Sequence, residues 1–471
     1  MPNPYYEQKR LIIALKCLVC YIAIYFFLQP VDGEIRATIT EKPNIILILV
    51  DDLGYGDIGS YNEEIDFTPN IDRLTKKGMS FTDFHSNGPM CSPTRAALLT
   101  GMYQHRLGGR FEAALSEKKN HEGMPLGVLT ISDVLRKEGY ATGMFGKWHL
   151  GYEQPYFPNN FGFDEFRGLL SGDGDHFTHI SRWGKKDWWH NSELNMENGY
   201  SVELITDDSI EFIEEHKNEA FFIYTAHLAI HFPWQGPEDP PHRKAGKKYG
   251  NNKWGIIKNE NNVRPHVKGM IEAIDKSVGR IINKLKELEL AKETLVIFTS
   301  DNGGYTHYYQ NEHKFENISN NGPLRGQKGQ VYEGGHRVPM IAYWPGKIRA
   351  GTETDETAMT MDFFPTLVEL TGSGPIKNQK IDGVSLLPVL LKNEHLPERT
   401  LFWKIRDDWA IRMGPWKLVN TGDDKQLFNL SNDIGEKRDI SSQRPELLKT
   451  LVSLYKEWLR EVTSYTQKWG K

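Results

Sequence analysis

Four runs of apolar residues along the chain each end abruptly in polar side chains. The runs are short, rich in β-branched and aromatic residues, and contain few polar positions. Uninterrupted apolar runs of this kind are typical of strands that are buried on both faces of a parallel sheet. The predicted strands span residues 44–50, 140–145, 221–226 and 294–300.

Segments with helical periodicity separate these runs. In the longest of them apolar residues recur every three or four positions, as on the buried face of an amphipathic helix. Strands that alternate with helices favour an α/β fold in which a large, mostly parallel sheet is sandwiched by helices. Ligands of such folds bind at the carboxyl ends of the strands, where the polar clusters of this chain fall. The predicted helices span residues 71–77, 131–137, 202–216 and 266–290.

The pattern changes after residue 375, at a segment rich in Gly and Pro. Beyond it the sequence predicts short strands and then one amphipathic helix over 445–462. We therefore predict a large α/β domain over residues 43–375 and a smaller C-terminal subdomain, an antiparallel sheet plus a helix, over 376–471. The polar stretch 235–268 predicts a long loop above the sheet. The predicted C-terminal strands span residues 399–404, 409–413, 416–419 and 426–429.

The N-terminal segment combines a basic start with an apolar run. Lys9 and Arg10 precede the apolar residues 11–28, which contain one charge, at Lys16. The charge-free part is shorter than the about 20 residues that a membrane helix needs and matches the roughly 7–15 residues of a secretory signal. Residues 1–33 are therefore predicted to be a signal peptide that directs the protein to the periplasm or outside the cell. An uncleaved membrane anchor formed by the whole run is the alternative.

The net charge and the cysteine content of the chain exclude some classes of function. With 57 Lys and Arg against 62 Asp and Glu, the formal net charge is −5. This balance argues against a nucleic-acid-binding protein, because such proteins need a basic excess. The chain has three cysteines, and Cys17 and Cys20 lie within the predicted leader. The mature chain would keep Cys91 alone, either as a free thiol or as a chemically modified residue.

Two pairs of residues with oxygen-bearing side chains follow predicted strands. Asp51 and Asp52 come directly after the first strand, and Asp301 and Asn302 come after the last. A single pair of this kind is more often a helix cap or a turn. Two pairs at the ends of neighbouring strands would bring together four hard oxygen donors, a set that suits Ca²⁺ or Mg²⁺ rather than zinc.

Cys91 lies in a segment typical of a helix start. Because Pro93 is of the type favoured as the first helical residue, we expect Cys91 at or just before a helix N-terminus. Backbone N–H groups at such a position favour negative charge. A buried, unreactive cysteine is the alternative.

Several motifs together resemble those of one enzyme family. Cys91-Ser-Pro-Thr-Arg95 matches the Cys-x-Pro-x-Arg signature of the type I sulfatases, and Gly146-Lys-Trp-His-Leu-Gly151 matches their second signature. From about residue 43 to 391 the chain therefore resembles these formylglycine-dependent, arylsulfatase-like enzymes of the alkaline phosphatase superfamily. Further motifs of the family follow in the expected order, at residues 51–52, 231–233, 301–303, 324–328 and 333–339.

The resemblance implies a cofactor and a set of site residues. Cys91 would be oxidised to Cα-formylglycine by a sulfatase-maturing enzyme, and one Ca²⁺ ion would lie beside it. The implied metal ligands are Asp51, Asp52, Cys91, Asp301 and Asn302. The implied catalytic residues are Cys91, Arg95, Lys147, His149, His231 and Lys328.

These residue types suit the hydrolysis of a sulfate ester. Lys147, Lys328 and the metal would hold the anionic sulfate and offset charge on the leaving oxygen. One hydroxyl of a hydrated aldehyde at position 91 would attack sulfur, with Asp301 as a candidate proton acceptor.

Three further residues complete the expected reaction. Arg95, one helical turn after residue 91, would reach back to that residue. His149 would take a proton from its second hydroxyl so that sulfate is released and the aldehyde is restored. His231 would protonate the departing alcohol.

A sulfated carbohydrate is the expected substrate, because such molecules occur outside the cytoplasm. The rings of Trp183, Trp188 and Trp189 either stack on sugar faces or are packing anchors. A phosphodiesterase or phosphonate hydrolase of the same superfamily is one alternative, although residues for only one metal ion are evident. A sulfated-glycan-binding protein without turnover is the other, and the complete set of candidate residues argues against it.

Overall fold

The computed structural model describes residues 42–119, 121–250, 263–310 and 313–466. The predicted leader, with Cys17 and Cys20, lies outside the described residues. Residues from Pro43 onward form one compact unit. Within the described ranges, no helix combines the length and the apolar character needed to cross a membrane.

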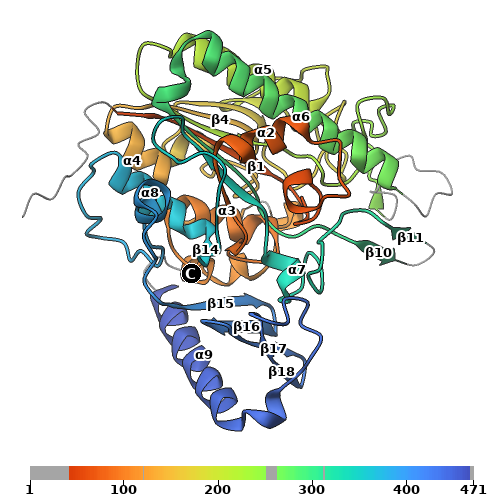
Figure 1. Cartoon of the computed structure of the whole chain (residues 1–471). Helices are drawn as coiled ribbons and strands as arrows, with labels where there is room; N and C mark the ends of the chain where they lie inside the picture. The colour runs from red at the N-terminus through yellow and green to blue at the C-terminus, as the bar shows by residue number, and fades with distance from the viewer. Residues whose placement is uncertain (1–41, 120, 251–262, 311–312, 467–471) are drawn as a thin grey trace, which may run out of the picture. The chain divides into compact units, whose positions relative to one another are not determined.

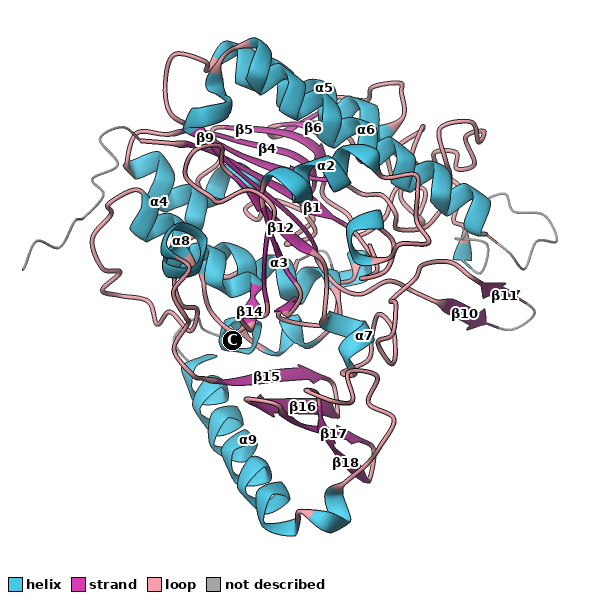
Figure 2. Cartoon of the chain, in the orientation of Figure 1, coloured by secondary structure: helices cyan, strands magenta, loops and turns pink. Residues whose placement is uncertain are grey.

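A ten-stranded sheet forms the centre of this unit (Figure 2). Its four central strands are the four predicted from the apolar runs, and all of them run parallel. They are β1 (Asn44–Val50), β4 (Ala141–Lys147), β8 (Phe221–Ala226) and β9 (Thr294–Ser300). The outer strands are β2 (Met79–Phe81), β5 (Glu165–Leu169), β6 (Trp189–His190), β7 (Glu193–Leu194), β12 (Met340–Tyr343) and β13 (Thr352–Thr354).

The strand order explains why the polar clusters meet. Along the sheet the order is β13-β2-β12-β9-β1-β8-β4-β5-β6-β7. Every residue of β1, β8 and β9 is buried, as the uninterrupted apolar runs require. Leu47 of β1 pairs with Tyr224 of β8 on one side and with Ile297 of β9 on the other. This register brings the carboxyl ends of the central strands to one edge of the sheet.

Helices cover both faces of the sheet (Figures 1 and 2). On α6 the buried apolar residues recur every three or four positions, so the predicted amphipathic stripe is the face packed on the strands. One face carries α2 (Pro69–Lys77), α5 (Ser201–Glu215) and α6 (Arg264–Glu287). The opposite face carries α3 (Cys91–Thr100), α4 (Ile131–Lys137) and α8 (Phe363–Leu370).

The C-terminal part is an antiparallel sheet with one long helix, as predicted. Its strands pair in sequence order, and α9 (Pro445–Tyr465) packs on them through stacked rings such as Trp409 and Tyr455, 3.9 Å between centroids. The apolar core of this part includes Ala97 of α3 and Met359. The boundary at residue 375 stays a prediction. The strands are β15 (Thr400–Ile405), β16 (Asp408–Met413), β17 (Trp416–Thr421) and β18 (Asp424–Asn429).

In the described part of the chain, four short strands and one short α-helix lie outside these two sheets. A hairpin of β10 and β11 projects from the loop after β9 (Figure 1), and β3 pairs with β14. These elements are β3 (Phe84–His85), β10 (His307–Gln310), β11 (His313–Glu316), β14 (Ala358–Met359) and α7 (Glu333–His336).

Candidate active site

The carboxyl ends of β9, β1, β8 and β4 lie side by side, and each leads into predicted site residues. Asp51 and Asp301 directly follow β1 and β9, Lys147 is the last residue of β4, and His231 lies in the loop after β8. All of these side chains are buried. The sheet therefore assembles, from segments far apart in sequence, the polar cluster that the strand ends predict.

Three carboxylates form the base of this cluster. Asp51, Asp52 and Asp301 each offer an oxygen, and these oxygens all lie within 4.8 Å of one another. Asn302 Nδ2 donates to Asp52 Oδ1 at 2.8 Å. Asp51 Oδ1 and Asn302 Oδ1 are buried and lack a hydrogen-bond partner among the described residues. Buried oxygens without a hydrogen-bond partner, next to clustered carboxylates, are suitable ligands for a hard divalent cation such as Ca²⁺.

Burial makes this cluster of negative charge costly. It raises the pKa of both Asp51 and Asp301; Asp301 also feels the charge of Asp51, while Lys147 opposes the rise at Asp51. The cluster therefore needs compensating positive charge.

Three buried cations meet the three carboxylates. Lys147 Nζ donates to Asp51 and Lys328 Nζ donates to Asp52. Arg95 Nε donates to Asp301 Oδ2 at 2.9 Å, and Arg95 Nη1 donates to the Lys147 carbonyl at 2.7 Å. Although burial disfavours its charge, Asp52 raises the pKa of Lys328 well above its ordinary value. These groups are therefore fixed positive charges beside the carboxylates.

Cys91 is the first residue of α3, and its side chain is buried. The predicted helix N-terminus is confirmed, but Pro93 is the third helical residue rather than the first. The reach of Arg95 back to residue 91 stays a prediction, because the hydrogen bonds of its guanidinium go to Asp301 and to the Lys147 carbonyl.

His149 and His231 each engage one ring nitrogen with a backbone carbonyl. His149 Nε2 donates to the Leu115 carbonyl at 3.1 Å, and no described residue bonds to its Nδ1. His231 Nδ1 donates to the Phe232 carbonyl at 2.8 Å. Burial and then the ammonium groups of neighbouring lysines hold the pKa of both rings well below the ordinary value.

A pocket of about 260 Å³ opens above these groups. Cys91, His149, His231 and Lys328 line it. The remaining predicted residues are buried behind this wall and contact one another or the wall residues; they are Asp51, Asp52, Arg95, Lys147, Asp301 and Asn302.

Comparison with protein families decides between the candidate functions. A family model described as "Sulfatase" matches residues 43–373, most of the chain. The chain belongs to the sulfatase family. It is therefore a sulfuric ester hydrolase, as the motifs around Cys91 predict. A second model, described as "N-sulphoglucosamine sulphohydrolase, C-terminal", matches residues 327–463.

Individual sulfatases match over most of their length. Human N-acetylgalactosamine-6-sulfatase is 32% identical over 477 residues, which cover 91% of this chain and 85% of the relative. Human arylsulfatase A is 30% identical over 478 residues, which cover 88% of this chain and 87% of the relative. The crystal structure of Ps i-CgsB superposes with a TM-score of 0.78 at 34% identity, over 89% of this chain and 93% of that chain. The crystal structure of Ps i-CgsB in complex with k-i-k-neocarrahexaose superposes with a TM-score of 0.77, at the same identity and coverage.

Sequence reasoning missed several residues of the sulfatase pocket. Tyr305 and Tyr308 line the pocket. They come shortly after the Asp301–Gly304 motif at the end of a predicted strand, and this position in the sequence could have indicated that they lie near the site. Among the tryptophans of the aromatic segment, Trp183 lines the pocket, whereas Trp188 is fully buried against His179. The other wall residues without a sequence assignment are Met90, Ala114, Leu115, Ser116, Glu117, Tyr152, Gly172, Asp173, Arg182 and Phe232.

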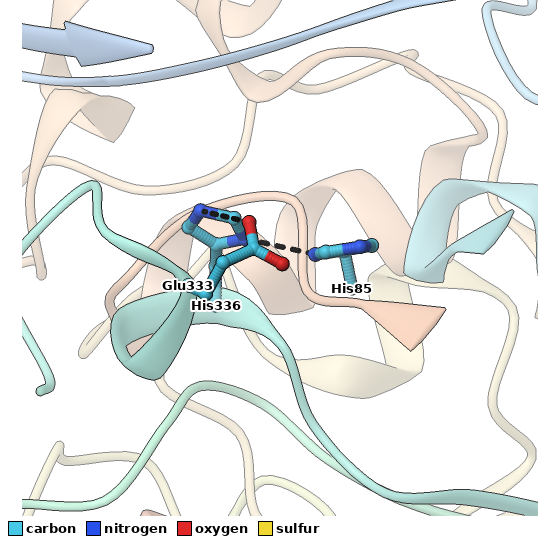
Figure 3. A group of neighbouring side chains, drawn as sticks. All are labelled: His85, Glu333 and His336. Carbon is cyan, nitrogen blue, oxygen red and sulfur yellow. Dashed lines mark hydrogen bonds and ion pairs between the residues drawn. The ribbon is translucent and has the colours of Figure 1, made fainter. Parts of the chain in front are cut away.

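A second group of metal-ligand types lies around α7 (Figure 3). Atoms of His85, Glu333 and His336 lie within 4.8 Å of one another. However, Lys417 Nζ donates to Glu333 Oε1 at 2.8 Å and lies 3.1 Å from His336 Nε2. An ammonium group already supplies the positive charge that a metal would bring, so this group ties the C-terminal sheet to α7.

Proposed function

We propose that this sulfatase hydrolyses sulfate esters of a sulfated carbohydrate, with one Ca²⁺ ion and a formylglycine made from Cys91. The observation that carries the proposal is the position of Cys91. It lines the pocket at a helix N-terminus together with Lys328, whose ammonium group donates to Asp52 of the carboxylate cluster.

Four side chains and residue 91 would hold the ion. Asp51, Asp52, Asp301 and Asn302 supply hard oxygens, two of which have no other partner among the described residues. The bound ion would supply positive charge for a sulfate oxygen and would lower the pKa of a hydroxyl on residue 91. The formylglycine, in its hydrated form, would supply that hydroxyl.

The chain's own cations orient the substrate. Lys328 lines the pocket and is held by Asp52, so its ammonium group is already oriented for a sulfate oxygen. Lys147, held by Asp51 behind the wall, adds positive charge to the site. Arg95 fixes Asp301 through two nitrogens of its guanidinium and keeps this carboxylate in place.

The two histidines move protons. His149 lines the same pocket as residue 91, and its Nδ1, which has no partner among the described residues, would accept a proton there. His231 Nε2 would donate a proton to the departing alcohol, because Nδ1 is already engaged with a carbonyl. A bound sulfate anion favours the protonated ring that this step needs.

A carbohydrate fits the rest of the pocket. Trp183, Tyr305 and Tyr308 present ring surfaces beside polar groups, a combination typical of sugar sites. The related proteins named N-acetylgalactosamine-6-sulfatase, and the neocarrahexaose complex of Ps i-CgsB, support the same substrate class.

We further propose that residues 1–33 export the chain to the periplasm or the exterior and that a sulfatase-maturing enzyme acts on Cys91. The basic start and short apolar run of the leader support export. Loss of the leader would leave Cys91 as the single cysteine, available for this modification.

Two measurements on protein from its native host test the proposal. Mass spectrometry of the peptide that contains residue 91 should show the aldehyde in place of the thiol. Turnover of 4-nitrophenyl sulfate should exceed that of bis(4-nitrophenyl) phosphate and should vanish in Cys91→Ala. An unmodified thiol in an active enzyme, or faster hydrolysis of the phosphate diester, would contradict the proposal.

A further inference from the structure

Arg182 is a cation in the pocket wall that the reaction described above does not use. Its Nε donates to Asp173 Oδ1 at 2.9 Å, and the other oxygen of Asp173 accepts from Arg243 Nη2 at 3.0 Å. Although burial opposes it, these two guanidinium groups hold the pKa of Asp173 below its ordinary value. Asp173 is therefore a fixed carboxylate that orients Arg182.

The outer part of the Arg182 guanidinium stays open to the pocket. Asp173 engages Nε, and no described residue forms a hydrogen bond to the two terminal nitrogens. The side chain is 28% exposed. The guanidinium carbon lies 5.1 Å from the centroid of the Phe232 ring, which also lines the pocket and restrains the guanidinium.

Arg182 is separate from the cations that face the carboxylate cluster. Lys147, Lys328 and Arg95 pair with Asp51, Asp52 and Asp301, whereas the ion pair of Arg182 is with Asp173. It shares the pocket wall with Cys91, Tyr308 and Trp183. A substrate with its reacting sulfate at Cys91 would therefore meet a further, oriented cation beside aromatic rings.

We propose that Arg182 binds a second anionic group of the substrate, a sulfate or a carboxylate on the sugar unit next to the one that carries the reacting sulfate. A guanidinium group offers parallel N–H donors that match two oxygens of either group. The inference rests on the proposed carbohydrate substrate and makes it more specific. The substrate class is an oligosaccharide with repeated anionic groups rather than an isolated monosulfated sugar.

Binding to inactive protein tests this without turnover. In a Cys91→Ala background, calorimetry should compare neocarrabiose sulfated on galactose alone with neocarrabiose that bears a second sulfate on the anhydro sugar. A second pair, a monosulfated chondroitin disaccharide and its carboxylate methyl ester, tests the carboxylate. The pair whose affinities differ identifies the group that is bound.

Matched variants assign the preference to Arg182. The doubly anionic ligand of that pair should bind at least about tenfold more tightly than its partner, which corresponds to about 1.4 kcal/mol. Arg182→Gln should reduce this ratio to less than about threefold, and Arg182→Lys should retain part of it. Lys186→Gln, which removes the same charge from an exposed position on the same loop, should keep the ratio.

Two outcomes would overturn the inference. One is equal affinity within both pairs for the Cys91→Ala protein, and the other is a preference that Arg182→Gln leaves intact. Neither depends on activity, so they are distinct from failure of the proposed function, which would appear as absent turnover of 4-nitrophenyl sulfate by the wild type.

Discussion

Glu333 of α7 and Lys417 of β17 form an ion pair of 2.8 Å in which both side chains are fully buried. Glu436 also pairs with Lys417, at 2.9 Å, and its carboxylate accepts the Glu333 backbone N–H at 2.7 Å. Although burial opposes it, Lys417 holds the pKa of Glu333 well below its ordinary value, so Glu333 stays ionised. The C-terminal sheet is thus tied to α7 by charges that have no access to water.

Lys417→Gln should destabilise the protein strongly. It leaves the buried carboxylates Glu333 and Glu436 without the cation that they share, which costs about 3–5 kcal/mol. Urea unfolding should show this loss, whereas Lys449→Gln should cost less than about 1 kcal/mol, because Lys449 is 70% exposed and its partner Glu446 is 83% exposed. Similar losses for the two variants would mean that the buried charges do not hold the C-terminal sheet to α7.

Gly172→Ala should impair catalysis while the fold is retained. A Cβ on Gly172 would lie 2.4 Å from Cε1 of His149, so the imidazole ring must move. A displacement of this kind lowers kcat by about 10–100-fold. Gly174→Ala is the matched control, since the nearest atom to its Cβ would lie at 3.8 Å. Equal kcat values for the two variants would show that the position of His149 is not critical.

The strands and the strand-end residues follow from local sequence. An apolar run that stops at Asp51 or Asp301 reports burial and a strand end together, which is why the central sheet and the carboxylate cluster could be predicted. The orientation of Arg182 could not, because Arg243 holds its carboxylate partner Asp173 from a distant loop. Trp183 and Trp188 look alike in sequence, and only tertiary packing places one in the pocket and the other in the core.

Asp301→Asn should weaken Ca²⁺ binding. Ca²⁺ at about 100-fold above its Kd should stabilise the wild type by about 2.7 kcal/mol, seen as a rise in Tm. The variant should lose most of that rise because a charged ligand becomes neutral. Asp57→Asn is the control: Asp57 is also buried but pairs with Arg264 at 2.6 Å, outside the cluster. A Ca²⁺-dependent rise in Tm that survives in Asp301→Asn would exclude this site.

His105 should make the fold sensitive to acid. Burial, followed by the charge of Lys404, lowers the pKa of His105 from its ordinary value of 6.5 to about 3. The unfolded chain therefore binds more protons between these values, and stability falls as pH falls from about 6.5 toward 3. The ring packs against Trp458 of α9, with centroids 5.1 Å apart.

Urea unfolding at two pH values isolates this contribution. Between about pH 6.5 and 5 the wild type should lose about 1.5 kcal/mol more than His105→Gln, in which the side chain does not titrate. The other buried histidines are present in both proteins and cancel. An identical pH dependence of the two unfolding free energies would contradict the assignment.

His231 should matter most for substrates with poor leaving groups. Its Nδ1 donates to the Phe232 carbonyl, which leaves Nε2 as the ring atom that can donate a proton to the departing oxygen. A sugar alkoxide needs that proton, whereas 4-nitrophenolate is stable without it. His231→Gln should therefore lower kcat on a sulfated neocarrabiose by about 10²–10⁴-fold and on 4-nitrophenyl sulfate far less.

His149→Gln provides the comparison for His231. His149 and residue 91 line the same pocket, and the proton transfer that we propose for His149 belongs to release of sulfate from residue 91, a step that every substrate shares. Its loss should slow the sugar sulfate and the aryl sulfate by similar factors, measured as released sulfate and released nitrophenol. If His231→Gln instead slows both substrates equally, His231 does not act as the acid for the leaving group and serves only to bind sulfate.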